Sequence, residues 1–420
     1  MFLGVIADDF TGATDIASFL VNNGLSTVQL NGVADVTLPE SVEAVVVSLK
    51  SRVCPVDEAV TLSLEALRYL KDIGCSQFFF KYCSTFDSTE KGNIGPVTDA
   101  LLHELGESFT VICPSLPVNG RTVYNGYLFV NGIPLDESGM RNHPLNPMRD
   151  ANLMRLMDAQ AAGKSGNVSL PVVAQGSDSV KTYLDVLKAQ GVSYAVLDAL
   201  TDSDLDVLAQ AVSSMPLVTG GSGLGGSIAR LHCPSVGGVE GATDLGLPVG
   251  RKTVLLSGSC SEMTNRQVNA YKAEGPFFPV SVEQCMQDAE GYAAKIAEAV
   301  VASSATLPVL VSATVPPDEL AVIQERFGVA ASHSKVELFF ARLAVILREE
   351  GYGNFIITGG ETSSVISQAL KVKGFHIGPQ IAPGVPWVRA LGEQLSLVLK
   401  SGNFGDERFF FVALSQIPKG

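Results

Sequence analysis

Two adjacent acids, Asp8 and Asp9, stand at the end of the first apolar run of the chain, and Thr11 and Gly12 follow them closely. Carboxylates can accept a proton, hold a hydroxyl group or coordinate a cation, so such a pair is a candidate for acid–base chemistry. The apolar residues 5–6 predict the end of a buried strand, which places the acids where a strand gives way to a helix. In an open parallel sheet, ligands bind in the crevice at this junction. We therefore expect Asp8 and Asp9 to be catalytic, with Thr11 and Gly12 beside the substrate.

A structural role for the same acids is the alternative. Asp commonly caps a helix by accepting a hydrogen bond from a free backbone N–H, and a helix is predicted from 13 to 21. One acid is enough for a cap, whereas two acids followed by Thr and Gly exceed that need. The sequence favours a catalytic role over capping alone, and it leaves open which of the two acids accepts the proton as the catalytic base.

Polar residues also follow three other apolar runs, at 45–47, 77–80 and 109–113. A hydroxyl-rich loop with charges of both signs can surround a polyhydroxylated ligand with donors and acceptors, although a plain solvated loop has a similar composition. The candidate substrate-binding residues of these loops are Arg52, Lys81, Ser84, Asp87 and Arg121.

Three loops in the second half combine glycine with hydroxyl residues between a strand and the next element. Free N–H groups and the helix dipole make such a junction a site for anions, and helix capping by Ser259 or Ser261 is compatible with this role. An acid in the second loop could contact a ribose or a metal ion. The candidate nucleotide-binding residues are Ser257, Ser259, Gly359, Gly360, Glu361, Thr362, Gly402 and Asn403.

The segment GGSGLGG at 220–226 contains the pattern G-x-G, which is typical of dinucleotide-binding loops. It lies at the end of a predicted domain, however, and no strand ending in an acid follows about 20 residues later. None of the glycine-rich loops has the Walker A pattern either. A Rossmann dehydrogenase and a P-loop NTPase are both disfavoured.

Strands and helices are predicted to alternate along most of the chain. Helical spacing of apolar residues predicts helices at 57–73, 149–163, 177–190 and 203–214, with strands in between at 171–174, 194–197 and from 217. The pairs Asn125-Gly126 and Asn131-Gly132 predict hairpin turns in an antiparallel insertion. Repeated strand–helix units predict an α/β fold with mostly parallel, layered sheets.

The alternation resumes after a stretch rich in Gly and Pro. Strands are predicted at 253–256, 309–311, 354–358 and 397–400, and helices from about 263, at 334–349 and up to 370. We expect one domain over 1–235, a linker over 236–250 and a second domain over 251–420.

The composition excludes several classes of protein. The 420 residues are 46% hydrophobic and 17% charged, as in a compact globular protein, and the formal charge of −14 argues against nucleic acid or a membrane surface as a partner. The seven cysteines show no ligand-like spacing, so we expect free thiols without a disulfide or a zinc ion. With neither a signal peptide nor a membrane-spanning run in view, we expect a cytoplasmic enzyme, and the sequence leaves open whether it forms a homo-oligomer.

Together, four segments resemble the four-carbon acid sugar kinases, a family once catalogued as a domain of unknown function. They are ADDFTGATD at 7–15, LLSGSCS at 255–261, TGGETS at 358–363 and KSGNFG at 400–405. The segment GMRNHPLNPM at 139–148 is similar to the 3-oxo-tetronate kinase branch of this family. The similarity covers both predicted domains and most of the chain.

This resemblance implies an ATP-dependent kinase whose first domain binds a tetronate and whose second domain binds ATP, with the active site in the cleft between them. It implies phosphorylation of the 4-hydroxyl of 3-oxo-tetronate and a requirement for Mg²⁺, for which the sequence assigns no ligand. The substrate carboxylate needs a local cation, and a bidentate Arg suits it best, so Arg52 is preferred and Arg121 is the second choice. Backbone amides would provide most of the phosphate contacts.

Other functions remain open at this point. The acceptor could be D-threonate or D-erythronate, or the protein could be an acid-sugar sensor that closes on a ligand without catalysis. A phosphatase of the haloacid-dehalogenase type also places an acid after its first strand, but it requires Asp-x-Asp, whereas Asp8 and Asp9 are adjacent.

Overall fold

The computed structural model describes residues 1–142, 146–233, 243–249 and 252–418. It divides into two compact units, unit 1 (Met1–Ala242) and unit 2 (Thr243–Gly420). Most of the expected linker, residues 236–242 and 250, lies outside the described residues, as does the middle of the segment 139–148. The cleft expected between the domains stays a prediction.

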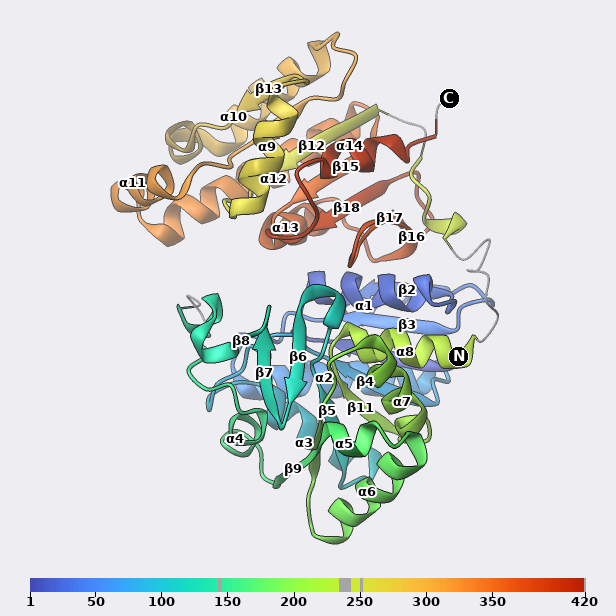
Figure 1. Ribbon diagram of the computed structural model, residues 1–420. Coiled ribbons are helices and arrows are strands. Elements are labelled where there is room, and N and C mark those ends of the chain that lie inside the picture. Colours follow the sequence, from blue (N-terminus) through green and yellow to red (C-terminus); the bar gives the residue numbers. More distant parts are fainter. Residues whose placement is uncertain (143–145, 234–242, 250–251, 419–420) are drawn as a thin grey trace. The chain divides into compact units, whose positions relative to one another are not determined.

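Unit 1 is built on a parallel sheet with strands in the order β2-β3-β1-β4-β11-β5-β10-β9 (Figure 1). Most of these strands are buried along their whole length, which is typical of a sheet covered on both faces. Their bounds are β1 (Leu3–Ala7), β2 (Thr27–Asn31), β3 (Ala44–Ser48), β4 (Gln77–Lys81), β5 (Thr110–Cys113), β9 (Ser165–Val168), β10 (Tyr194–Leu197) and β11 (Leu217–Gly220).

The helices of unit 1 fall into two groups of mutually contacting neighbours. In one group α1, α8, α7 and α6 contact one another in turn, and in the other α2, α3 and α4 do so, as expected for two layers around a sheet. Their bounds are α1 (Phe10–Asn22), α2 (Val56–Asp72), α3 (Ile94–Leu105), α4 (Leu153–Asp158), α5 (Leu170–Val173), α6 (Ser177–Ala189), α7 (Asp202–Val212) and α8 (Ser222–His232).

Strand β1 lies between β3 and β4, so the chain crosses from one side of β1 to the other after β3. The register aligns Ala7 with Ser48 of β3 and with Lys81 of β4. The three strands therefore end together, and the loops that follow them leave the sheet at the same edge. This is the topological switch point at which α/β sheets bind ligands.

A small antiparallel sheet, β6 (Arg121–Tyr124), β7 (Tyr127–Val130) and β8 (Ile133–Pro134), is inserted between β5 and β9. Both Asn-Gly pairs form the predicted turns, with positive φ at Asn125 (51°) and Asn131 (53°) and at the glycine that follows each. This is the geometry of type I′ turns. Short 3₁₀ helices flank the insertion: η1 (Pro117–Asn119), η2 (Leu135–Glu137) and η3 (Gly139–Asn142).

One part of unit 1 differs from the sequence prediction. The strand expected at 171–174 is absent, because residues 170–173 form helix α5, and the strand is β9 at 165–168. Pro171 lies in the first turn of α5, where its missing N–H costs nothing. Strand β9 has only Val168 fully buried and so shows no apolar pattern. Likewise, only residues 153–158 of the helix expected at 149–163 form helix α4.

The glycine-rich segment at 220–226 joins β11 to α8 and allows close packing. A Cβ atom at Gly220 would lie 2.3 Å from the carbonyl oxygen of Cys113, and one at Gly225 would lie 2.8 Å from the side chain of Ile16 on α1. Helices α1 and α8 pack side by side (Figure 1). The glycines of this segment are explained by backbone packing within unit 1.

Unit 2 has a mixed sheet with strands in the order β13-β14-β12-β15-β18-β17-β16. The strands from β13 to β18 in this order are parallel, whereas β17 is antiparallel to both of its neighbours. Strands β13, β16 and β17 were not predicted from the sequence. The bounds are β12 (Lys252–Ser257), β13 (Phe277–Pro279), β14 (Leu310–Ser312), β15 (Tyr352–Thr358), β16 (Gly374–Ala382), β17 (Val385–Ala390) and β18 (Ser396–Lys400).

The helices of unit 2 also form two groups. Helices α10, α11 and α13 contact α12, and α9 contacts α14. The bounds are η4 (Asp244–Gly246), α9 (Glu262–Lys272), α10 (Val282–Ala302), α11 (Pro317–Phe327), α12 (Val329–Glu349), α13 (Gly360–Ala369) and α14 (Phe409–Ser415). Among the described helices of both units, none is long and apolar enough to cross a membrane. All seven cysteines are free thiols.

We predict that Gly220→Ala destabilises the protein by about 1–3 kcal/mol, because the new methyl group would overlap a backbone carbonyl that cannot rotate away. Gly139→Ala is the matched control, since a Cβ there meets no atom within 4 Å. Urea unfolding followed by circular dichroism measures both. Equal midpoints for the two variants would contradict the packing role of Gly220.

Candidate active site

Asp8, Asp9 and Arg52 form one ion cluster at the carboxyl edge of the sheet in unit 1. Arg52 donates to Asp8 with two atoms, Nε to Oδ2 at 3.0 Å and Nη2 to Oδ1 at 2.8 Å. Its Nη2 also donates to Oδ1 of Asp9 at 2.6 Å. A guanidinium group matches a carboxylate in this two-atom geometry better than any other cation does. Arg52 thus neutralises part of the charge of two adjacent acids.

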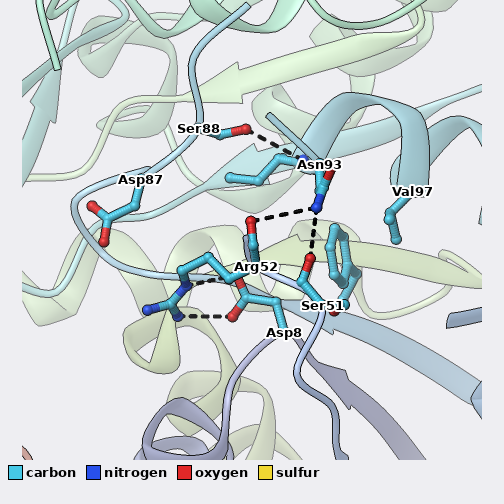
Figure 2. Close-up of a pocket in the computed structure, with 9 residues that line it drawn as sticks. Asp8, Ser51, Arg52, Asp87, Ser88, Asn93 and Val97 are labelled. Carbon is cyan, nitrogen blue, oxygen red and sulfur yellow. Dashed lines mark hydrogen bonds and ion pairs between the residues drawn. The ribbon is translucent and has the colours of Figure 1, made fainter. Parts of the chain in front are cut away.

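Backbone hydrogen bonds fix the position of this cluster. The N–H groups of Ser51 and Arg52 donate to the carbonyl oxygen of Asp8, which extends the pairing of β1 with β3 into the loop. The side chain of Asn93 donates to the carbonyl oxygen of Ser51 at 2.7 Å (Figure 2) and to that of Cys54 at 2.9 Å. Asn93 therefore holds the loop that carries Arg52, a role that the sequence analysis did not predict.

Asp9 also caps helix α1. Its Oδ1 accepts from the N–H of Gly12 at 3.0 Å, and its Oδ2 accepts from the hydroxyl of Thr11 at 2.9 Å. A Cβ at position 12 would lie 2.2 Å from Oδ1 of Asp9, so this cap requires glycine. The capping role and a role in chemistry are compatible, since the Asp9 side chain keeps 25% of its surface exposed.

The two carboxyl groups differ in pKa. Burial raises the pKa of Asp8 more than the neighbouring Arg52 lowers it. Burial also acts to raise the pKa of Asp9, but the charges of Arg52 and Lys81 and the bonds from Thr11 and Gly12 outweigh it, and this pKa is lowered. Adjacent acids whose pKa values are moved in opposite directions are typical of a division of roles in an active site.

A second buried charge cluster surrounds Lys81. Its ammonium group lies 3.8 Å from Oδ2 of Asp15 and donates to the carbonyl oxygen of Tyr82 at 3.0 Å. The hydroxyl of Ser222, at the start of α8, also donates to Oδ2 of Asp15. Two buried atoms here, Oδ1 of Asp15 and Nε of Arg121, have no hydrogen-bond partner among the described residues. Buried polar atoms without a partner are rare in folded proteins, and they occur at functional sites or beside bound water.

Ser84 and Asp87 lie in the loop after β4. Ser84 is half-buried, and Asp87 is buried with its Oδ1 accepting from Thr85 at 2.6 Å. Asp87, Asp8 and Asn93 are among the residues that line a small cavity of about 10 Å³ (Figure 2). This volume holds about one water molecule, so the cavity itself is too small for a sugar.

The parallel strands of unit 2 also end in register. Ser257 of β12 is aligned with Ser312 of β14 and with Thr358 of β15, and Thr358 is aligned with Lys400 of β18. The predicted nucleotide-binding residue Ser257 is fully buried, and its hydroxyl accepts from Thr358 at 2.7 Å. Ser257 thus links the ends of β12 and β15, from which the first and second glycine-rich loops begin.

A cavity of about 370 Å³ opens above these strand ends. Gly359 lines this cavity, has a φ of 117° and directly precedes α13. The first N–H groups of α13 have no hydrogen-bond partner inside their own helix. A Cβ at Gly359 would lie 2.9 Å from Oγ1 of Thr362 and 3.2 Å from N of Ser259, so the glycine lets two loops approach each other. The predicted residues that line the cavity are Ser259, Gly359, Gly360, Glu361 and Thr362.

Gly402 and Asn403 belong to a loop beside this cavity. A Cβ at Gly402 would lie 2.9 Å from Oγ of Ser261 and 3.0 Å from Oγ of Ser259. Oδ1 of Asn403 accepts from the N–H of Met263 at 3.5 Å. These contacts tie the third glycine-rich loop to the first.

The other wall of the cavity was not predicted from the sequence. It is apolar and comes largely from α11 and α12, and its residues include Val282, Val315, Leu320, Ile323, Val329 and Val336. His333 of α12 also lines it and contacts Oε2 of Glu361 at 2.6 Å from Nε2. The hydrogen bond between them raises the pKa of His333 and lowers that of Glu361. No motif marks these residues, because the wall depends on which faces of two helices meet.

Two family models match the chain and leave few residues uncovered. Residues 3–228 match the model described as a sugar-binding N-terminal domain, and residues 254–410 match that described as a nucleotide-binding C-terminal domain. The first model covers the clusters of Arg52 and Lys81, and the second covers the cavity and its three loops.

Close relatives match over almost the full length. A 3-oxo-tetronate kinase of Brucella melitensis is 59% identical, over 98% of this chain and 95% of its own. A 3-oxo-tetronate kinase of Haemophilus influenzae is 58% identical, over 97% and 98%. A crystal structure of a Haemophilus influenzae protein is similar with a TM-score of 0.85 and 56% identity, covering 99% of this chain and 100% of that one.

We predict that Arg52→Met destabilises the protein by about 3–5 kcal/mol at pH 7, because it removes the cation from the buried carboxylate of Asp8 and the partly buried carboxylate of Asp9. Arg68→Met is the control, since it removes another Arg–carboxylate pair, with Glu104, that is exposed to solvent. Urea unfolding of both variants measures the difference.

The loss caused by Arg52→Met should shrink as the pH falls to 4. Without the cation, the pKa of Asp8 in the folded variant rises further above its unfolded value, and the pKa of Asp9 rises as well. The variant therefore loses stability as the pH rises through this range and the acids ionise. A loss that is the same at pH 4 and pH 7 would contradict an electrostatic role for Arg52.

Proposed function

The chain belongs to the family that joins a sugar-binding N-terminal domain to a nucleotide-binding C-terminal domain, and we propose that it is an ATP-dependent 3-oxo-tetronate kinase. The observation that carries this proposal is the full-length identity of 44–59% to proteins named 3-oxo-tetronate kinase. The reaction we propose transfers the γ-phosphoryl group of ATP to the 4-hydroxyl, giving 4-phospho-3-oxo-tetronate and ADP.

In unit 1 we propose that the substrate carboxylate binds to cationic groups that keep free donors. Nη1 of Arg52 has no hydrogen-bond partner among the described residues, although Nε and Nη2 are engaged by the two acids. Lys81 and Arg121 add positive charge near Asp15. In a chain of net charge −14, the buried Lys81 and the partly buried Arg52 and Arg121 supply the local attraction that an acid sugar needs.

We assign different roles to the two acids. Asp9 is the more exposed and its lowered pKa keeps it ionised, so we propose that it accepts a hydrogen bond from the reacting hydroxyl and orients it. Phosphoryl transfer depends mainly on such positioning, since its transition state is loose. Asp8 is buried under Arg52, and we propose that it positions this guanidinium group for the substrate.

The cavity of unit 2 suits ATP in its size and in its donors. Its volume of about 370 Å³ lies in the usual range of ligand pockets, and its apolar wall suits a base while the amides at the start of α13 suit phosphates. Mg²⁺ bound with ATP would neutralise phosphate charge during transfer. Glu361 is engaged by His333, and we assign the ion no protein ligand.

The function is tested by coupled detection of ADP with purified protein, ATP and a panel of 3-oxo-tetronate, D-threonate and D-erythronate. We expect ADP to form only with an acid sugar and fastest with 3-oxo-tetronate. No turnover with any of the three would contradict the proposal. Binding of a tetronate without binding of ATP would favour a sensor, and hydrolysis of a generic phosphoester that Asp8→Asn and Asp9→Asn abolish would favour a phosphatase.

We predict that Asp9→Asn lowers kcat about 100- to 10,000-fold with a small change in KM. Asn caps helices as well as Asp does, so the fold of α1 is retained while the charge is lost. Asp8→Asn should mainly raise the KM for the acid sugar by loosening Arg52. Steady-state kinetics decide, and the reverse pattern would exchange the roles of the two acids.

We predict that Gly359→Ala raises the KM for ATP about tenfold, because the methyl group would crowd Ser259 and Thr362 at the cavity. Gly392→Ala is the matched control: Gly392 also has positive φ, at 71°, but a Cβ there meets nothing within 4 Å. The KM for ATP of the two variants separates crowding at the cavity from general backbone strain. An equal effect in both would contradict this role of Gly359.

A further inference from the structure

Lys400, the last residue of β18, is a fully buried lysine bonded only to uncharged oxygens. Its ammonium nitrogen donates to the carbonyl oxygens of Gly402 at 2.7 Å and Ser401 at 3.1 Å, and to Oγ1 of Thr264 at 3.2 Å. A charged ammonium group has three protons for these three acceptors, whereas a neutral amine has two. The hydrogen bonds therefore favour the charged form, and burial opposes it.

No acid neutralises Lys400 within the described residues. The charged or titratable side chains of the elements packed around it are Glu262, Arg266, Tyr271 and Lys272 on α9, Tyr352 on β15, Glu361 on α13, Arg389 on β17, and Asp406, Glu407 and Arg408 before α14. The acids among them have other partners: Arg266 pairs with Glu262 and Glu407, and His333 with Glu361. Asp406 accepts from the N–H of Arg408.

The remaining groups also lie in other contacts. Arg408 pairs with Glu274, the hydroxyl of Tyr271 donates to Pro308, and Arg389 lies opposite Ser396 at the other end of β18. Burial is accordingly the cause that lowers the pKa of Lys400, to about 7. The amine is thus held near the middle of its titration at physiological pH.

Lys400 lies directly beneath the loops that we assign to the phosphates. Its carbonyl oxygen accepts from the N–H of Gly359 at 2.8 Å, and its ammonium group holds the carbonyl oxygen of Gly402. Thr264, which it also contacts, donates to the same oxygen of Gly402 at 2.8 Å. One residue therefore contacts the second glycine-rich loop through its backbone, and the third loop and the start of α9 through its side chain.

We propose that Lys400 is an internal countercharge for the phosphates of the bound nucleotide, and that the nucleotide binds together with one proton taken up by this amine. The inference rests on the proposed function, because it requires a nucleotide in this cavity. Phosphate charge brought near a buried amine favours its ammonium form. The proton comes from solvent and adds to the nitrogen lone pair, so no other bond changes.

This coupling gives nucleotide binding a defined dependence on pH. Below pH 7 the amine is already charged and binding takes up little proton. Above pH 7 the free protein has lost the proton that the complex retains, so affinity falls by up to about tenfold for each pH unit. Lys400 acts here through its charge, as a positioning residue for the loops and the phosphates.

Calorimetric titration of the full chain with ADP at pH 8, in buffers of different ionisation enthalpy, counts the protons taken up. ADP is fully ionised at this pH and does not contribute. We expect an uptake that approaches one proton per ADP at pH 8 and falls to about half a proton at pH 7, where ADP is still mostly ionised. An uptake of zero at pH 8 in a chain that binds ADP would overturn this inference and leave the proposed function intact, whereas no binding of ADP at either pH would overturn both.

Variants of Lys400 separate its charge from its packing. Lys400→Met should bind ADP more weakly at pH 7, with no proton uptake and no change in affinity between pH 7 and pH 9. Lys400→Arg, which keeps a permanent charge, should bind without uptake as well. Lys373→Met, an exposed lysine before β16, is the control and should behave as the unchanged protein does. Proton uptake that persists in folded Lys400→Met would overturn the assignment to this amine.

Discussion

Burial of charge at the carboxyl ends of parallel strands is the constraint on which both halves of this structure depend. A carboxylate or ammonium group removed from water loses several kcal/mol of solvation unless partners replace the water. Asp8 and Asp9 meet this cost through one guanidinium group, one helix N-terminus and the hydroxyl of Thr11. Because Arg52 is shared, moving any member of the cluster leaves another charge without a partner. The site is therefore held in one arrangement.

The two units meet this constraint in opposite ways. Unit 1 buries acids and compensates them with Arg52, whose Nη1 keeps its donors free among the described residues. Unit 2 buries a cation, Lys400, and gives it hydrogen bonds without an opposite charge. The first arrangement fixes geometry, as a site that must orient a small acid sugar requires. The second arrangement leaves a positive charge that an anionic ligand can neutralise.

The sequence predicted the features that depend on local pattern. Asn125 and Asn131 specify their turns by backbone preference alone, and the acids after β1 were located because a strand end is visible in apolar periodicity. Features that depend on partners distant in sequence were missed. The pairing of Arg52 with Asp8 joins residues 44 apart, and the contact of His333 with Glu361 depends on the packing of α12 against α13. Strand β9 was misplaced because an edge strand with one buried residue has no pattern to detect.

The net charge of −14 is a poor guide to which ligands this protein binds. Exposed charges are screened by salt over about 8 Å at physiological ionic strength, so the acidic surface acts weakly at a buried site. Lys81 and Lys400 are each at most 2% exposed, and their charges are screened far less. Each lies at the last position of a strand, where the sheet brings several loops together. A few buried cations in these positions can therefore attract anionic ligands while the rest of the surface stays acidic.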